Sequence, residues 1–215
     1  MRKKQRHGAI ALLEFESVAA GILASDVMVK RSPIALLRCG TIHPGRFLIL
    51  VGGSVASTEE AYAAGLQVGE SRGALQGKVF LGDVHPYLHD AVLGKRRSID
   101  GDALAVVETH SSPALLAAVD AAVKSTPVGL AEVRLGDDLG GNALALLSGD
   151  LFDVETALDI CGERSGGQLL ARTLLPRLDS DLRSVLGEGT RFGSCSAWEP
   201  SGAEYPEEVA CSWDV

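Results

Sequence analysis

At 215 residues and 22.4 kDa, the chain is long enough for one large domain or for two domains of about 100 residues each. Hydrophobic residues make up 46% of it and can supply a core. The net charge of -8 argues against a general nucleic-acid binder, because neutralising phosphates requires clustered Lys and Arg. No stretch approaches the roughly 20 apolar residues of a membrane-spanning helix, so no membrane association is expected. We interpret the one basic cluster, Arg2, Lys3, Lys4 and Arg6, as a solvated tail.

The cysteines are scattered along the chain without C-x-x-C spacing. They are Cys39, Cys161, Cys195 and Cys211. This distribution favours reduced thiols over a disulfide scaffold or a zinc ribbon. The sequence therefore predicts a cytoplasmic protein.

The first elements form a strand and an amphipathic helix. The short apolar run Ala9–Phe15 predicts the strand, and Ser17 is suited to N-cap a helix that continues to about Arg31. Pro33 then prevents the helix from continuing. The large apolar residues on one face of the helix are Val18, Ile22 and Val29.

Two strands, a helix and a fourth strand follow. Ser57 and Glu60 have the spacing of a capping box and predict the start of the second helix. The remaining expected elements are strands near Ile34–Cys39, Phe47–Val51 and Leu75–Leu81, a short helix near Pro86–Leu93, and a linker over Lys95–Asp102.

The chain then repeats itself. With Ala11–Cys39 written above Ala105–Val133, ten of twenty-nine positions are identical, whereas ordinary composition, at roughly 7% per position, gives about two. The match continues with two extra residues in a loop of the second copy, where "LILVGGSV" faces "LALLSGDL". The identical pairs are Ala11/Ala105, Glu14/Glu108, Ser17/Ser111, Ala20/Ala114, Ala24/Ala118, Asp26/Asp120, Val29/Val123, Lys30/Lys124, Pro33/Pro127 and Leu36/Leu130. This period exceeds that of a solenoid repeat and indicates a duplicated domain.

The second copy predicts the same order of elements. Ser111 opens its first helix, Pro127 ends it, and Asp153 is the N-cap candidate of its second helix. The expected inward residues of its first helix are Leu115, Val119 and Val123. Strand, helix, two strands, helix, strand is the ferredoxin-like arrangement, so the predicted class is α/β, more narrowly α+β, in tandem. The predicted divisions are residues 9–94, a linker 95–102, residues 103–187 and an acidic extension 188–215.

Both copies resemble a bacterial microcompartment shell domain. The resemblance rests on "AIALLEFESVAAGILASDVMVKRSP" and "ALAVVETHSSPALLAAVDAAVKSTP", on the strand-to-helix turns "LVGGSV" and "LSGDL", and on "DVHPYL" and "LPRLD" near each copy's end. It covers about residues 9–187. Because each copy begins with the strand and helix that carry E-x-x-S and D-x-x-x-K, it resembles the unpermuted members.

A tandem copy implies the trimeric class of this family. Three such chains form a pseudohexameric tile of a polyhedral shell, beside hexameric tiles and pentameric vertices made of other shell proteins. A closed ring of six similar domains needs only one type of heterologous contact. The resemblance places Lys30, Lys124 and Arg177 at the edge of the tile, while the first copy has Asp83 where the second has Arg177.

The resemblance also implies a central pore that admits small metabolites. In this fold the loops between the second and third strands converge on the symmetry axis, so "GTIHPGR" and "RLGDDLGGN" would alternate around it. Aspartates and histidines there would favour neutral or cationic molecules over anions. The expected pore-lining residues are Thr41, Ile42, His43, Pro44, Gly45, Asp137, Asp138, Leu139, Gly140 and Gly141.

His43 is the candidate metal ligand. Three copies around a three-fold axis could bind a transition metal, because neutral imidazole is a common ligand. Some members carry a cysteine at this position and hold an iron–sulfur cluster there, whereas here the nearest cysteine is Cys39 at a strand end. A polar pore lining without any cofactor is the alternative. His85 and His89, at i and i+4, lack an evident third ligand and are read as structural.

Three readings of function remain open. The first is a non-enzymatic shell tile, the second adds a metal or redox centre at His43, and the third is a ferredoxin-like regulatory module that binds a small ligand. An enzyme is not expected, because Asp137 and Asp138 have no evident base or nucleophile beside them and no catalytic motif is present. The extension 188–215, with Trp198, Tyr205 and Trp213, is either a flexible acidic tail or a segment that docks on a surface.

Overall fold

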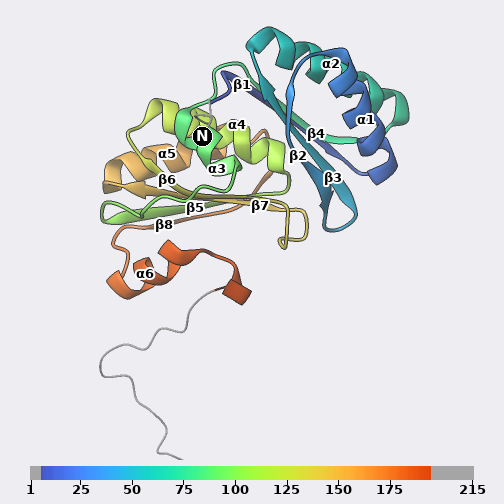
Figure 1. Cartoon of the computed structure of the whole chain (residues 1–215). Coiled ribbons are helices and arrows are strands. Elements are labelled where there is room, and N and C mark those ends of the chain that lie inside the picture. Colours follow the sequence, from blue (N-terminus) through green and yellow to red (C-terminus); the bar gives the residue numbers. More distant parts are fainter. Residues whose placement is uncertain (1–5, 195–215) are drawn as a thin grey trace, which may run out of the picture. The chain divides into compact units, whose positions relative to one another are not determined.

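The computed structural model describes residues 6–194 and contains two successive domains with one order of elements (Figure 1). The first domain consists of β1 (Ala9–Phe15), α1 (Val18–Arg31), β2 (Ala35–Ile42), β3 (Arg46–Gly53), α2 (Val55–Arg72), β4 (Leu75–Leu81) and α3 (Pro86–Val92). The second consists of β5 (Ala103–Thr109), α4 (Ser112–Ser125), β6 (Gly129–Leu135), β7 (Ala143–Gly149), α5 (Leu151–Arg164) and β8 (Leu169–Leu175). The predicted order of elements is confirmed in both copies.

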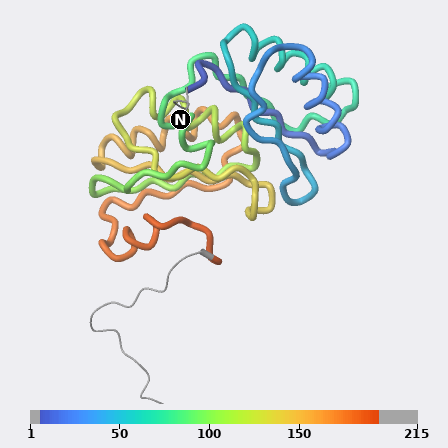
Figure 2. Tube along the Cα trace, in the orientation of Figure 1, coloured from blue at the N-terminus to red at the C-terminus, as the bar shows by residue number. Residues whose placement is uncertain are grey.

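Each domain has a four-stranded antiparallel sheet whose helices cover one face. The strand orders are β2-β3-β1-β4 and β6-β7-β5-β8. The registers are equivalent, since Glu14 of β1 lies opposite Gly77 of β4 and Glu108 of β5 lies opposite Ala171 of β8. Figure 2 traces the two domains one after the other along the chain. The ferredoxin-like, α+β class predicted from the sequence is therefore confirmed.

Polar side chains start the first helix of each domain as predicted. Ser17 caps α1 by accepting the Ala20 N–H, and Ser111 caps α4 by accepting the Ala114 N–H. The residues that follow each helix, Ser32 and Thr126, adopt extended backbone ahead of the prolines.

The predicted starts of the second helices are wrong by three residues. Ser54 caps α2 and accepts the N–H of Ser57, and Asp150 occupies the N-cap position of α5, so Ser57 and Asp153 lie inside their helices. The strands before both helices end in glycine and lead directly into the cap, which leaves no room for a longer turn. The Ser57–Glu60 pair has capping-box spacing but lies one turn too late.

The strand β1 is buried on both faces. Ala11, Leu13 and Phe15 pack against α1 and α2, whereas Ile10 and Leu12 join a core that includes the second domain. Burial on both sides explains why this strand reads as a nearly continuous apolar run rather than as an alternating one.

Of the apolar face predicted for α1, Val18 packs against the core of the first domain, but Ile22 and Val29 do not. The buried residues of this helix are Ala20, Gly21, Ala24 and Met28. Ile22 is 57% exposed and Val29 is 42% exposed. In α4 the predicted inward residues, Leu115, Val119 and Val123, are buried as expected. The face carried by Ile22 and Val29 therefore has no cover within the described part of the chain.

The helix α4 joins the two domains. It packs on β5 and β7 of its own sheet and, with its opposite side, on β4 and β1 of the first domain. At this contact a side-chain carbon added at Gly77 would lie 3.2 Å from the Pro113 ring. Asp120 of α4 accepts the backbone N–H of His85, at 2.9 Å. Two domains of one chain thus share a continuous core.

The linker 95–102 has no helix or strand but is tied to the second domain. Arg96 pairs with Glu132 at 2.5 Å, the Arg97 N–H donates to Ala131, and the Asp100 N–H donates to the Ser148 hydroxyl. These bonds hold the linker along the second sheet.

Residues 179–194, the last of the described residues, belong to a compact unit separate from the two domains. It contains α6 (Ser180–Glu188), capped by the carboxylate of Asp179, and a short 3-10 turn, η1 (Phe192–Ser194). The aromatic candidates of the extension lie outside the described residues, as do two cysteines and most of the basic cluster; these residues are Trp198, Tyr205, Trp213, Cys195, Cys211, Arg2, Lys3 and Lys4.

Candidate pore loops and assembly surfaces

The first candidate pore loop is a tight hairpin between β2 and β3. The strands extend to Ile42 and from Arg46, so the loop is shorter than predicted and comprises His43, Pro44 and Gly45. The His43–Pro44 peptide bond is cis, and Gly45 has a φ of +91°, which glycine adopts without strain. Thr41 and all three loop residues are exposed, whereas Ile42 is buried.

The second candidate loop joins β6 and β7 over residues 136–142. Turn hydrogen bonds hold it, including the Gly141 N–H to the Gly136 carbonyl and the Asn142 N–H to the Leu139 carbonyl. Asp137, Asp138 and Gly140 are exposed, Leu139 is half-buried and Gly141 is buried. The loop therefore presents carboxylates on a glycine-rich turn.

The structure brings these two loops together within one chain. A side-chain carbon added at Gly141 would lie 2.8 Å from the His43 carbonyl oxygen and 3.2 Å from the Pro44 ring. One added at Gly136 would lie 2.5 Å from the Ile42 side chain. Only glycine permits this approach, so Gly136 against Ile42 and Gly141 against the His43–Pro44 segment form the contact between the loops. The side chains of His43 and the two aspartates remain exposed.

An ion pair beneath the loops was not predicted from the sequence. Arg46 donates to the fully buried carboxylate of Glu14 at 2.8 Å and to the His110 carbonyl at 3.4 Å. The other oxygen of Glu14 accepts the Ser112 N–H, at the start of α4. One carboxylate therefore links the first hairpin to the second domain.

Burial has the largest influence on the pKa of the Glu14 carboxylate. Its pKa is raised because the carboxylate is removed from water, an effect that the hydrogen bond and positive charge of Arg46 oppose. The sequence did contain a signal for this site. Glu14 is the one charged residue in the strand "AIALLEF", and a charge in a fully buried strand requires a partner.

The candidate edge lysines belong to equivalent i,i+4 pairs. Lys30 pairs with Asp26 at 2.7 Å, and Lys124 pairs with Asp120 at 2.5 Å. The side chain of Asp26 is 51% exposed, whereas that of Asp120 is 6% exposed because it also contacts the His85 backbone. Arg177 is exposed and lies after β8.

No metal-binding group of three His, Cys, Asp or Glu side chains occurs within residues 6–194 of a single chain. His43 is an isolated exposed imidazole, so a site there would need more than one chain. His85 and His89 do not converge, because His85 caps α3 and His89 is buried against His7. In the described range, Cys39 is exposed and Cys161 is buried, and both are free thiols.

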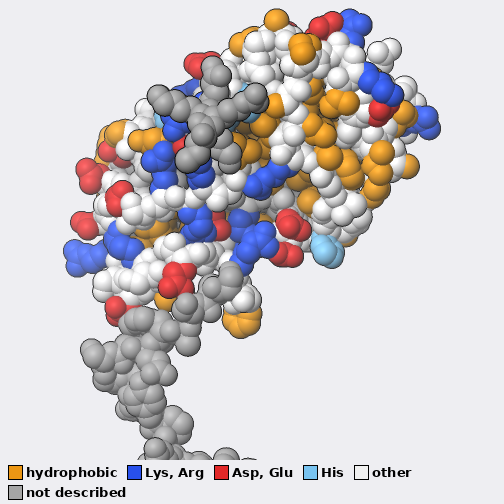
Figure 3. Space-filling model, viewed as in Figure 1, with side chains coloured by type: hydrophobic (Ala, Val, Ile, Leu, Met, Phe, Trp, Pro, Cys, Tyr) orange, Lys and Arg blue, Asp and Glu red, His pale blue; other side chains and the backbone are white. Residues whose placement is uncertain are grey.

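Two surfaces are exposed in one domain although the equivalent surface of the other domain is buried within the chain. In the second domain Leu116 and Val123 of α4 are buried, but their equivalents Ile22 and Val29 on α1 are exposed. The sheets differ in the opposite sense. In the first domain α4 packs on β4, whereas Ala171 and Thr173, at the equivalent positions of β8 in the second domain, are exposed. Figure 3 shows hydrophobic side chains gathered on the surface of the first domain.

No helix among the described residues is long and apolar enough to cross a membrane.

Comparisons with known proteins agree with the duplication. A family model for the BMC domain matches twice, over residues 9–83 and 103–178. The bacterial microcompartment shell protein PduT of Citrobacter freundii is 33% identical over 183 residues, which cover 84% of this chain and 98% of that protein. The carboxysome assembly protein CcmO of Synechocystis sp. (strain PCC 6803) is 27% identical over 196 residues, covering 85% of this chain and 65% of that protein.

A solved structure shares the fold. The crystal structure of a microcompartments protein from Desulfitobacterium hafniense DCB matches with a TM-score of 0.71 and 30% identity, and covers 82% of this chain and 98% of that one. Together with the double family match, this shows that the chain belongs to the family of bacterial microcompartment shell proteins and carries two BMC domains in tandem.

Proposed function

We propose that the chain is a non-catalytic tile of a microcompartment shell, a homotrimer that closes into a ring of six similar domains around a central pore. The observation that carries this proposal is the contrast between the two first helices. The outer face of α4 is buried on the first domain, while the equivalent face of α1 is uncovered.

The contact within the chain supplies a template for the contact between chains. Each domain has a helix side, on α1 or α4, and a sheet side, on β4 or β8. Within the chain the sheet side of the first domain covers the helix side of the second. The helix side of the first domain and the sheet side of the second have no such partner within the chain. Because their equivalents fit each other in the interdomain contact, we expect these two surfaces to fit each other as well.

Such leftover surfaces produce head-to-tail association. A heterologous contact generates a ring if its rotation closes. Three two-domain chains give six domains, the number of the pseudohexameric tile that the family resemblance implies. Covering Ile22 and Val29 would also remove an apolar patch that costs free energy in water.

The loops of such a ring would line its pore. Because the His43 hairpin and the 136–142 loop touch within each chain, they would alternate around the axis. The exposed Asp137, Asp138 and His43 would then favour neutral or cationic small metabolites over anions. Lys30, Lys124 and Arg177 would serve contacts to other shell proteins at the tile edge, including hexameric tiles and pentameric vertices.

A transition-metal centre on the three-fold axis is the second candidate. The hairpin does not fit an iron–sulfur cluster, because such clusters are held by cysteine thiolates and Cys39 lies within β2 rather than in the hairpin. The support for the metal centre is the exposed His43 at a hairpin tip, which a three-fold axis would triplicate. Bound there, a transition metal could carry electrons or act as a Lewis acid, and three imidazoles would be its protein ligands.

Native mass spectrometry tests the tile directly. We expect wild-type protein to give a trimer and Ile22→Asp to give monomers, because a carboxylate would be buried without a partner in the ring contact. Ser71→Asp is the control, since it adds the same charge on α2, which is not part of the interdomain contact, and should remain trimeric. A monomeric wild type, or a trimeric Ile22→Asp, would refute the ring.

The same spectra separate the two candidates. Extra mass on the wild-type trimer that disappears in His43→Ala would establish the metal centre. A trimer of bare chains, from protein purified without oxygen or chelators, would leave His43 as part of the pore lining.

A further inference from the structure

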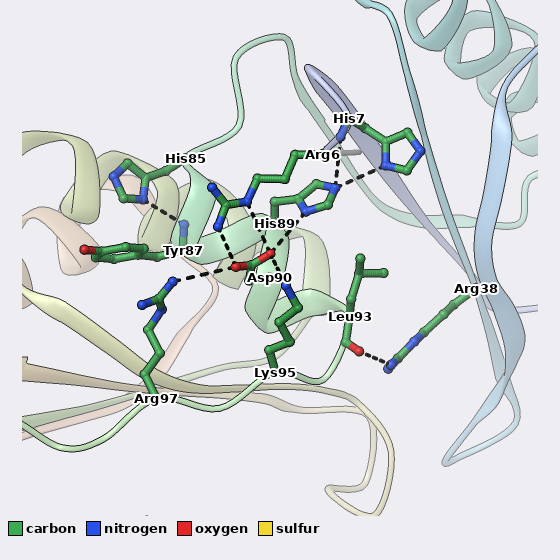
Figure 4. Close-up of polar contacts among 10 residues, drawn as sticks. All are labelled: Arg6, His7, Arg38, His85, Tyr87, His89, Asp90, Leu93, Lys95 and Arg97. Carbon is green, nitrogen blue, oxygen red and sulfur yellow. Dashed lines mark hydrogen bonds and ion pairs between the residues drawn. The ribbon is translucent and has the colours of Figure 1, made fainter. Parts of the chain in front are cut away.

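Three basic side chains converge on one carboxylate at the end of the first domain. Asp90 of α3 has a side chain that is 6% exposed, and it pairs with Arg6 at 2.8 Å, Lys95 at 2.9 Å and Arg97 at 3.6 Å (Figure 4). The three cations come from the segment before β1 and from the linker after α3. Arg6 is therefore held in an ion pair, and the prediction that it belongs to a solvated tail is wrong.

The charges in this cluster do not balance. Asp90 is the one carboxylate within residues 6–194 that pairs with any of the three cations, so the group carries an excess of two positive charges. The pKa of Asp90 lies far below its usual range, chiefly because of the Arg6 hydrogen bond and also because of Lys95. The carboxylate is thus ionised at neutral pH, and the excess remains.

The cluster is also fixed in position. His89 is buried, and its Nε2 accepts the backbone N–H of His7 at 3.2 Å, which places Arg6 beside Asp90. The guanidinium of Arg97 lies 4.0 Å from the centre of the Tyr87 ring. The Nδ1 of His89 is buried without a hydrogen-bond partner and lies 3.8 Å from Asp90. Burial lowers the pKa of His89, so its ring stays neutral at pH 7 and keeps its acceptor nitrogen.

The outer sides of the cations remain open to solvent. The side chains of Arg6, Lys95 and Arg97 are 51%, 56% and 39% exposed. A guanidinium has five N–H donors and an ammonium has three, so donors remain beyond those that Asp90 engages. Fixed donors with excess positive charge suit a tetrahedral oxyanion, which offers several acceptor oxygens.

The second copy retains one of the four residues of this cluster. At the offset of 94 residues, Arg191 matches Arg97, but Ser184 stands in place of Asp90, Gly189 in place of Lys95 and Asp100 in place of Arg6. The arrangement therefore does not follow from the domain fold and is particular to the first copy.

We propose that Arg6, Lys95 and Arg97, ordered by Asp90, form a binding site for a phosphate-type oxyanion, one per chain. The ligand is either free phosphate or the phosphoryl group of a small metabolite. This site is separate from the pore loops and does not depend on the proposed ring.

Equilibrium dialysis of the full-length protein against labelled inorganic phosphate tests the proposal. We expect saturable binding of one phosphate per chain, with a dissociation constant on the order of 1 mM for an exposed site. The variant Lys95→Gln/Arg97→Gln should bind at least ten-fold more weakly. Arg72→Gln is the charge-matched control, because Arg72 ends α2 outside the cluster, and it should bind like the wild type.

A second variant and a competing ligand show which residues and which kind of phosphate the binding depends on. Arg6→Gln provides a second, independent lesion if the double variant does not fold, as judged by circular dichroism. Displacement of phosphate by glycerol 3-phosphate would assign the site to phosphoryl groups from either source, and failure to displace it would restrict the site to free phosphate. Wild-type protein without saturable binding, or unchanged binding in well-folded Lys95→Gln/Arg97→Gln, would overturn the proposal.

Discussion

The helices α1 and α4 occupy equivalent places in two copies of one fold, yet their outer faces have opposite environments. Leu116 is fully buried, while its equivalent Ile22 is 57% exposed. The ion pair at the end of each helix follows the same rule, because Asp120 is covered and Asp26 is not. The difference does not come from the helices themselves, which are both apolar on this side. It comes from what the chain places next to them.

Duplication changes which contact surfaces the chain leaves exposed. A single-domain chain would expose both sides of its contact surface, whereas the tandem chain satisfies one contact internally and exposes one complementary pair. The residues of the internal contact and those of the exposed surfaces can then differ from each other. Arg46 pairs with Glu14 at the interdomain contact, whereas the positions equivalent to these two residues hold Asn142 and Glu108.

The interiors of the two domains also differ while keeping a similar total volume. Gly21 of α1 faces Phe47 of β3, where an added side-chain carbon would lie 2.5 Å from the ring. The equivalent positions in the second domain hold Leu115 and Ala143, both fully buried. A small residue on the helix and a large one on the strand have thus exchanged places, as cores tolerate when volume is conserved.

The largest effect is expected from Leu116→Ala. It should lower the free energy of unfolding by about 2–5 kcal/mol at every protein concentration, because it opens a cavity inside one chain. Ile22→Ala should instead change the stability of the isolated chain by no more than about 0.5 kcal/mol and raise the concentration below which the proposed trimer dissociates. Urea denaturation over a range of protein concentrations separates the two. Similar concentration-independent losses in both variants would contradict the contrast between the faces.

A smaller effect is expected from Gly21→Leu. The new side chain collides with Phe47 and should cost about 1–3 kcal/mol of stability. Adding Phe47→Ala reproduces the pairing of the second domain and should recover most of that loss. Thermal unfolding of the single and double variants measures the recovery, and an additive loss in the double variant would show that the two domains are not packed by interchangeable pairs.

The smallest effect is expected from Asp90→Asn, at about 1–2 kcal/mol at pH 7, because it weakens charge-assisted hydrogen bonds. Since the folded-state pKa of Asp90 is depressed, its carboxylate stabilises the protein above the unfolded-state value of about 4, and this contribution is lost as the pH falls below it. The difference between variant and wild type should therefore shrink in acid. Ser184→Ala, at the equivalent position of the second copy, should change stability by less than about 0.5 kcal/mol at any pH. A gap at pH 2 as large as the gap at pH 7 would argue against ionisation of Asp90 as its cause.

The sequence predicted most of the fold. The strands Ala9–Phe15 and Leu75–Leu81 have the predicted bounds, and both serine caps of the first helices are correct. These features depend on local patterns, namely short apolar runs and a serine three residues before an N–H donor. The second-helix caps were misplaced because the Ser57–Glu60 spacing mimics a capping box inside a helix.

The site was predicted less completely, for a physical reason. The sequence named both loops, but the contact between them and the Arg46–Glu14 ion pair depend on how two domains pack. Likewise, the apolar face of α1 was recognised, but periodicity does not reveal whether its cover lies in the same chain. The role of Asp90 could not be predicted, because Arg6 and Arg97 reach it from segments without secondary structure.

Disulfide trapping tests the central claim most directly. Within the chain, β4 and α4 meet at Gly77 and Pro113, and the equivalent positions are Ala171 and Ala19, both exposed. In a background with Cys39, Cys195 and Cys211 changed to serine, the Ala19→Cys/Ala171→Cys protein is oxidised and its covalent mass is measured under denaturing conditions. The account predicts covalent dimers and trimers, limited to three chains and absent from each single variant. Exclusively monomeric chains after oxidation would contradict the proposal that the uncovered face of α1 meets the second sheet of another chain.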